Sequence, residues 1–214
     1  MYMKASRLLA ALAALLAVVL VVAVLQTGES PEKVIVDARN RLLGSKGWVF
    51  EERVNFTKGW VRVLVSGTVD LGSHTLNTTV VVLRGSQPSL SVIYSNRSVT
   101  LVNLGGGWAR AGEGWRVNDT VIYRLLELAR ASPEKHLKPS AKGFTVFFGG
   151  GCTDTCTGLY QYLLRLAGLE GSNPTSYKGV LTVEEGYPRA VYVEFYEGGE
   201  ATCSLLYSLR PLNV

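Results

Sequence analysis

The chain has 214 residues, and its 22 basic and 17 acidic side chains give a formal net charge of +5 at pH 7. The basic residues form no run interleaved with aromatic residues, so the composition does not favour nucleic acid as a partner. Beyond an apolar N-terminal segment about 185 residues remain, which is enough for one domain with a sizeable hydrophobic core.

The apolar N-terminal segment runs without a charge from Leu8 to Leu25 and follows Lys4 and Arg7. Eighteen residues of helix reach roughly 27 Å, which just spans a hydrocarbon core. The run is longer than a usual signal-peptide core and has no small-x-small exit, so residues 1–28 are predicted to be an uncleaved transmembrane anchor. A cleaved signal peptide and a pilin-type leader remain open. Lys4 and Arg7 predict a cytoplasmic N-terminus and a single-pass cell-membrane protein, with residues 29–214 extracellular.

N-x-Ser/Thr sequons support that extracytoplasmic location. They begin at Asn55, Asn77, Asn96 and Asn118. Random placement of these residue types would give only about one such triplet, and a sequon accepts a glycan only on an exposed surface outside the cytosol. The external part is therefore predicted to be a glycoprotein.

The first elements after the anchor are a helix and a long series of strands. The helix is predicted from Pro31 to about Gly44, because Ser30 can cap it and proline suits the first helical position. From Trp48 to about Trp115 apolar and polar residues alternate, with turn residues at short intervals. This pattern predicts an antiparallel meander.

Helices and strands alternate in the second half of the chain. Two helices are predicted, at residues 118–131 and 154–167, with residues 135–139 as a basic connector between the first of them and the next strand. Further strands are predicted at residues 144–148, 180–184, 190–196 and 201–209. The order predicts an α+β fold, in which a single sheet carries helices on one face.

Three short tracts carry a resemblance to a known family: Gly-Thr-Val-Asp at residues 67–70, the tract from Gly107 to Trp115, and residues 179–183 followed by Tyr187-Pro188. On these tracts and the element order, residues 31–210 resemble the LolA/LprG-like half-barrel superfamily of lipoprotein carriers and lipid-binding lipoproteins. The resemblance implies a curved antiparallel sheet with helices on its concave face, an apolar cavity, and a lipid or lipoprotein ligand. The acylated cysteine of the mycobacterial group is absent here.

Apolar residues of the predicted strands and helices are candidates for lining such a cavity. They are Phe50, Trp60, Tyr94, Trp108, Phe147 and Leu163. The alternative is a solid core, which aromatic and β-branched residues form in many sheet proteins.

The external part has three cysteines, which predict one disulfide and one free thiol. Cys152 and Cys156 are four positions apart and close a short loop, while Cys203 lies in the last predicted strand. The pair Cys152–Cys156 is favoured, and Cys156–Cys203 remains an alternative. A redox or copper site is a further possibility, but the external part has only two histidines and no methionine to complete it. No metal or cofactor is predicted.

Catalytic patterns are missing from the sequence. Gly149-Gly150-Gly151 precedes a predicted helix, but no Lys-Ser/Thr follows it as a phosphate-binding loop requires. The acidic pair Glu51-Glu52 falls in a predicted strand, where adjacent side chains point to opposite faces and cannot form a dyad. With the ligand that the resemblance implies, we therefore expect a non-catalytic, membrane-anchored binding protein for a lipid or a lipidated partner. A pilin-like structural subunit and a thiol redox or metal-binding protein are the alternatives.

Overall fold

The computed structural model of the protein describes residues 29–212, so the predicted anchor at residues 1–28 lies outside the described part. Among the described residues, no helix is both long and apolar enough to cross a membrane. The chain from Pro31 onward forms one compact unit.

One antiparallel sheet of eleven strands dominates this unit. The strands are β1 (Gly47–Phe56), β2 (Val61–Asp70), β3 (Thr75–Arg84), β4 (Gln87–Ser95), β5 (Thr100–Asn103), β6 (Trp108–Gly112), β7 (Glu134–Ser140), β8 (Gly143–Gly151), β9 (Ser176–Glu184), β10 (Tyr187–Glu197) and β11 (Glu200–Pro211). Their order across the sheet is β6-β5-β4-β3-β2-β1-β11-β10-β9-β8-β7. The predicted meander is confirmed, and a second meander follows it, with β1 and β11 paired in the middle of the sheet.

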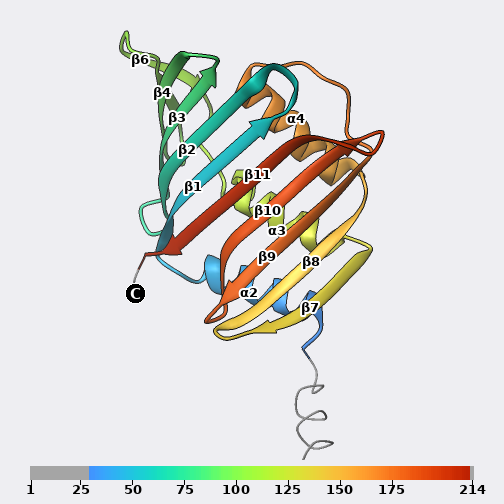
Figure 1. Ribbon diagram of the computed structural model, residues 1–214. Coiled ribbons are helices and arrows are strands. Elements are labelled where there is room, and N and C mark those ends of the chain that lie inside the picture. Colours follow the sequence, from blue (N-terminus) through green and yellow to red (C-terminus); the bar gives the residue numbers. More distant parts are fainter. Residues whose placement is uncertain (1–28, 213–214) are drawn as a thin grey trace, which may run out of the picture. The chain divides into compact units, whose positions relative to one another are not determined.

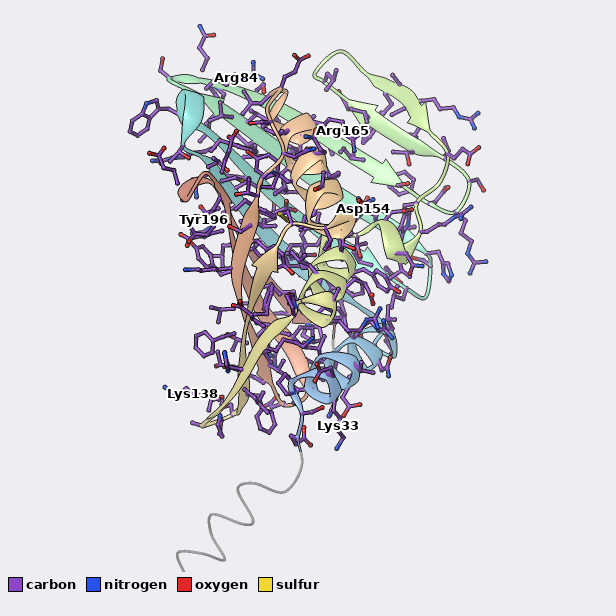
Figure 2. The ribbon with its side chains drawn as sticks, turned by 90° about the vertical axis from the view of Figure 1, so that its right-hand side faces the viewer. Lys33, Arg84, Lys138, Asp154, Arg165 and Tyr196 are labelled. Atoms are coloured by element: carbon purple, nitrogen blue, oxygen red, sulfur yellow. A yellow bond between two sulfur atoms is a disulfide. The ribbon has the colours of Figure 1, made fainter. Side chains whose placement is uncertain are left out.

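Three α-helices lie on the same face of the sheet, which curves around them (Figures 1 and 2). They are α2 (Pro31–Leu43), α3 (Val121–Ala131) and α4 (Asp154–Ala167), and short 3-10 turns form η1 (Lys58–Trp60) and η2 (Val117–Asp119). The three predicted helices are confirmed to within a few residues. Helix α3 follows β6 at one edge of the sheet and precedes β7 at the other, so it carries the chain across the concave face.

Strict alternation along the central strands decides which side chains face the helices. On β1, Trp48, Phe50 and Val54 are buried, whereas Glu51 and Arg53 are exposed. Burying one such apolar side chain contributes about 1.5–3 kcal/mol, and the buried side chains of sheet and helices form one continuous core. The concave face therefore supplies both the stability of the domain and the walls of any internal site.

Two glycines of the sequence tracts that carry the family resemblance have the same structural role. Gly67 is the cross-strand partner of Phe50, and Gly179 is the partner of Phe148. A Cβ on Gly67 would lie 2.9 Å from the Phe50 ring and 2.3 Å from the carbonyl oxygen of Asn77. A Cβ on Gly179 would lie 2.3 Å from the Phe148 ring. Each glycine thus lets a phenylalanine ring fold over the neighbouring strand.

The prediction for residues 135–139 was wrong, because they form most of edge strand β7 rather than a connector. Their backbone pairs with β8 throughout, and the exposed Lys138, seen in Figure 2, is typical of an edge that resists further pairing. Gly149 to Gly151, which precede the predicted helix, extend β8. A Cβ on Gly150 would lie 2.7 Å from the Pro133 ring, so the glycine permits this close approach.

Candidate ligand-binding pocket

A cavity of about 120 Å³ lies between the concave face of β1 to β4 and the segment from the end of β6 to α4. Its apolar lining consists of Phe50, Val65, Val69, Leu76, Val80, Ile93, Trp115, Val121 and Leu166. Its polar lining consists of Glu52, Thr78, Arg116, Asp119, Thr120, Tyr162 and Tyr207. The combination of an apolar wall and a few polar groups is typical of small-molecule sites.

Aromatic contacts fix the wall on the β1–β11 side. The rings of Phe50 and Tyr207 stack with centroids 5.4 Å apart and planes 8° apart. Trp48 Nε1 donates a hydrogen bond to the Tyr207 hydroxyl at 3.3 Å, so that buried hydroxyl has a partner. Since Gly67 leaves room for the Phe50 ring, the sequence tract around Gly67 helps to shape this wall.

Hydrogen bonds hold the η2 side of the cavity. The Arg116 backbone N–H donates to the Asp119 carboxylate at 3.1 Å, and the Asp119 N–H donates to the Arg116 carbonyl oxygen at 2.9 Å. Trp115 Nε1 donates to the His74 carbonyl oxygen at 3.1 Å, which ties the indole to the β2–β3 turn. Arg116 and Asp119 are exposed, so charged groups border the cavity on its solvent side.

Glu52 is the exceptional member of the lining. It lies on the concave face of β1 and is only 2% exposed, and its Oε1 has no hydrogen-bond partner among the described residues. Burial raises the pKa of Glu52 to about 8, so the carboxyl is protonated and neutral at pH 7. Burial and then the Glu52 charge raise the pKa values of Tyr162 and Cys203 well above their usual range.

The sequence carries a signal for Glu52 in its alternation rather than in a motif. The prediction that Glu51 and Glu52 point to opposite faces is consistent with their burial. Extending the alternation from Trp48 and Phe50 to Val54 would also have placed position 52 on the concave side. The alternation thus distinguishes the buried carboxyl of Glu52 from the exposed carboxyl of Glu51.

Only one of the six predicted cavity residues, Phe50, lines the cavity. Leu163 is fully buried in the core on α4, and Tyr94 is half-buried next to the lining residue Ile93. Three others point to solvent: Trp60, Trp108 and Phe147 are 83%, 53% and 42% exposed.

Each exposed aromatic has a local reason. Trp60 ends the 3-10 turn between two strands, and all five residues of β6, including Trp108, are exposed. Phe147 alternates with Val146 and Phe148, which face the core. Aromatic character alone therefore did not identify the concave face.

The sequon asparagines lie at or near the surface. Asn55 and Asn77 are exposed positions of β1 and β3, and Asn118 is exposed in η2. Asn96 is half-buried, and its Oδ1 accepts hydrogen bonds from the N–H groups of Ser98 and Val99 at 2.9 and 3.0 Å. Glycosylation of these residues stays a prediction.

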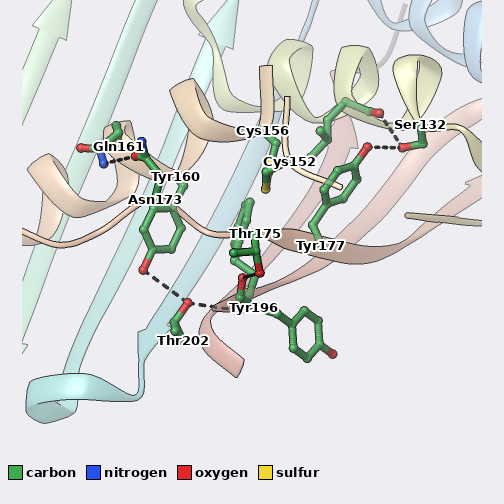
Figure 3. The surroundings of a disulfide bond; sticks show 12 residues. Ser132, Cys152, Cys156, Tyr160, Gln161, Asn173, Thr175, Tyr177, Tyr196 and Thr202 are labelled. Carbon is green, nitrogen blue, oxygen red and sulfur yellow. Dashed lines mark hydrogen bonds between the residues drawn. A yellow bond between two sulfur atoms is a disulfide. The ribbon is translucent and has the colours of Figure 1, made fainter. Parts of the chain in front are cut away.

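The predicted disulfide Cys152–Cys156 is confirmed (Figure 3). It joins the segment after β8 to the first turn of α4, and the Cys152 N–H donates to the Thr175 carbonyl oxygen at 2.9 Å. Cys203 is free and buried in β11. Among residues 29–212 no three His, Cys, Asp or Glu side chains are grouped as metal ligands.

Comparison with known proteins supports the architecture. No family model matches the chain, and neither does any curated protein sequence. The fold is similar to that of LprF from Mycobacterium bovis, with a TM-score of 0.52 and 8% identity over 86% of this chain and 95% of that one. An uncharacterized conserved protein from Thermus thermophilus gives a TM-score of 0.48 and 8% identity over 87% and 90% of the two chains. The similarity to LprF shows a shared fold, which agrees with the LolA/LprG-like half-barrel that the sequence tracts predicted.

Proposed function

We propose that this domain binds an apolar chain of a lipid or a lipidated partner in the cavity between sheet and helices, without catalysing a reaction. The observation that carries the proposal is the apolar cavity on the concave face, where Phe50, Val65 and Val80 face Leu166 of α4. The burial of apolar ligand surface would supply the affinity, at about 25 cal/mol per Å².

The size of the cavity limits what enters in this conformation. Its volume of about 120 Å³ is below the roughly 300 Å³ at which drug-sized ligand pockets begin. It is close to the roughly 150 Å³ of an engineered apolar cavity that binds benzene. A short chain segment fits as the cavity stands, and a longer chain requires α4 to move away from the sheet.

The proposed location is the outer face of a membrane. Residues 1–28 act as a single-pass anchor in this proposal, with Lys4 and Arg7 on the cytoplasmic side. The sequons at Asn55, Asn77 and Asn118 support an extracytoplasmic domain because their side chains are exposed. A ligand drawn from the membrane would then reach the domain without crossing the cytosol.

A pair of substitutions on β3 tests the proposal. Val80 lines the cavity, whereas the adjacent Val81 points to the other face of the sheet. Val80→Phe should fill the cavity and abolish binding, and Val81→Phe should leave binding unchanged. Full-length protein of each type, purified from its host membrane, would be compared by native mass spectrometry. Circular dichroism of each protein checks that it is folded.

The expected result is an adduct in the lipid mass range on the wild type and on Val81→Phe, but not on Val80→Phe. A wild-type mass offset only by glycans would contradict the proposal. It would favour the pilin-like structural alternative, which depends on residues 1–28. An adduct that persists on Val80→Phe would place the ligand elsewhere.

A further inference from the structure

Glu52 is a buried acid that the packing of the domain does not explain. Its neighbours on the concave face of β1, Phe50 and Val54, are apolar and buried, and no hydrogen-bond donor among the described residues reaches its Oε1. An unsatisfied buried polar group is costly, whereas an apolar residue of similar size would stabilise the core. The unsatisfied carboxyl therefore indicates a hydrogen-bonding ligand that is not part of the chain.

The groups that face Glu52 indicate the charge of that ligand. Tyr207 of β11 is its cross-strand neighbour, and Tyr162 of α4 lines the same cavity. The Cys203 thiol lies further along β11, opposite Phe56. All three are neutral at pH 7, because tyrosine and cysteine titrate above this pH and burial raises their pKa values further. The facing positions on β2 and β3, such as Val65 and Thr78, carry no charge. The formal charges nearby lie outside this ring of neutral groups: the Arg124 guanidinium lies over the Tyr162 ring, 5.6 Å from its centroid, and Arg116 and Asp119 border the cavity on its solvent side.

A neutral hydroxyl suits this interior better than an ammonium group. An ammonium would require two charges in an apolar cavity, and desolvating both can exceed the energy of their attraction. A protonated carboxyl offers one donor and one acceptor, and an alcohol hydroxyl is also both a donor and an acceptor. The two groups can therefore satisfy each other without moving an ion out of water.

We propose that the Glu52 carboxyl is the hydrogen-bonding anchor for the hydroxyl group of an aliphatic alcohol, whose chain packs against Phe50, Val80 and Ile93. This inference rests on the proposed binding of an apolar chain and adds the polar group that the ligand carries. The hydroxyl enters the cavity, and the chain follows along the concave face toward the side bordered by Arg116 and Asp119.

Three probes that share a six-carbon chain test this ligand class: hexane, 1-hexanol and hexylammonium. The full-length chain would be held in lipid nanodiscs with labelled valine methyl groups, and shifts of the Val65 and Val80 methyls would report occupancy of the cavity. Probe dissolved in the bilayer does not give this signal. The free aqueous concentration of each probe would be measured, so that partition into the bilayer does not bias the affinities.

We expect 1-hexanol to bind the wild type about two- to tenfold more tightly than hexane, as one additional hydrogen bond between neutral groups predicts. Glu52→Leu should remove this preference, and Glu52→Gln should retain part of it, because an amide is also a donor and an acceptor. Glu51→Leu, on the exposed face of β1, is the matched control and should keep the wild-type preference. The methyl spectrum of each variant shows whether it is folded.

Three results would overturn the inference, and each has a distinct meaning. Equal binding of hexane and 1-hexanol by the wild type would mean that Glu52 is satisfied by water alone. Tightest binding of hexylammonium would assign a cationic ligand. An unchanged preference in Glu52→Leu would place the hydroxyl elsewhere. Failure of all three probes to shift either methyl would instead contradict the proposed function itself.

Discussion

At the scale of single residues, the buried carboxyl makes the stability of the domain depend on pH. Burial raises the pKa of Glu52 to about 8 in the folded state, against an ordinary value of 4.5 for a glutamate. Between these two values the unfolded chain has released the proton while the folded chain retains it. The free energy of unfolding therefore falls as pH rises through this window, by up to roughly 5 kcal/mol, and the penalty is complete above pH 8.

We predict that Glu52→Gln removes this contribution, because an amide does not titrate. Urea unfolding at about pH 4, 6 and 8 should show the variant gaining stability relative to the wild type as pH rises. Glu51→Gln, at an exposed position of the same strand, should follow the wild-type curve. Parallel pH curves for the wild type and Glu52→Gln would mean that the folded carboxyl is already satisfied.

Single residues also show what the sequence could and could not predict about the site. Phe50 was found because it belongs to a regular alternation on β1. Trp60 and Trp108 are aromatic residues of the predicted meander, but both are exposed. The contact between Phe50 and Gly67 depends on the register of two strands, and the sequence does not specify a register before the strands pair.

At the scale of elements, one arginine links the sheet to the helix that covers the cavity. An Arg84 guanidinium nitrogen at the end of β3 donates to the carbonyl oxygens of Ala167 and Gly168 at 2.6 and 2.7 Å. These carbonyls end α4 and have no partner within the helix. A cation there also interacts favourably with the helix dipole.

We predict that Arg84→Gln lowers the free energy of unfolding by about 1–2 kcal/mol, because it removes hydrogen bonds from a charged donor at the helix end. Arg62→Gln, at an exposed position of the adjacent strand β2, is the control and should change stability by less than about 0.5 kcal/mol. Urea unfolding measures both. Equal effects of the two substitutions would show that the end of α4 does not depend on Arg84.

Helices and strands whose own residues show a regular apolar pattern were predicted correctly. A strand that depends on pairing with a neighbouring strand was not. Helix α4 has a regular apolar stripe and ends at Gly168, which adopts the left-handed conformation. Strand β7 is rich in lysine and contains Pro139, so its sequence resembles a connector. It is a strand because β8 offers a full set of backbone partners, and β-structure depends on such context more than helices do.

At the scale of the whole molecule, one continuous core implies one cooperative unfolding transition. Buried residues from both meanders and all three helices belong to the same cluster, including Trp48 on β1 and Cys203 on β11. We predict that loss of tryptophan fluorescence and exposure of the Cys203 thiol occur at the same urea concentration. The thiol should resist alkylation in the native protein and react once per chain when unfolded with the disulfide intact. Transitions at different urea concentrations would show that the two meanders unfold separately.

The topology of the sheet is the part that local patterns could not supply. Alternation identified a first meander and a set of later strands, but nothing in β1 or β11 specifies that they pair with each other. The resemblance to the LolA/LprG-like superfamily supplied the half-barrel, and the similarity to LprF supports it. Long-range pairing of this kind is decided by the whole chain.

The central pairing of β1 with β11 has a consequence for biosynthesis. Strand β1 is made early and β11 last, and Tyr207 of β11 forms part of the cavity wall. While the ribosome is still translating, β1 has a free edge, and the first meander can form only half of the sheet. The cavity is completed when β11 emerges and closes the gap, so the proposed ligand can be loaded only after translation of the sheet has finished.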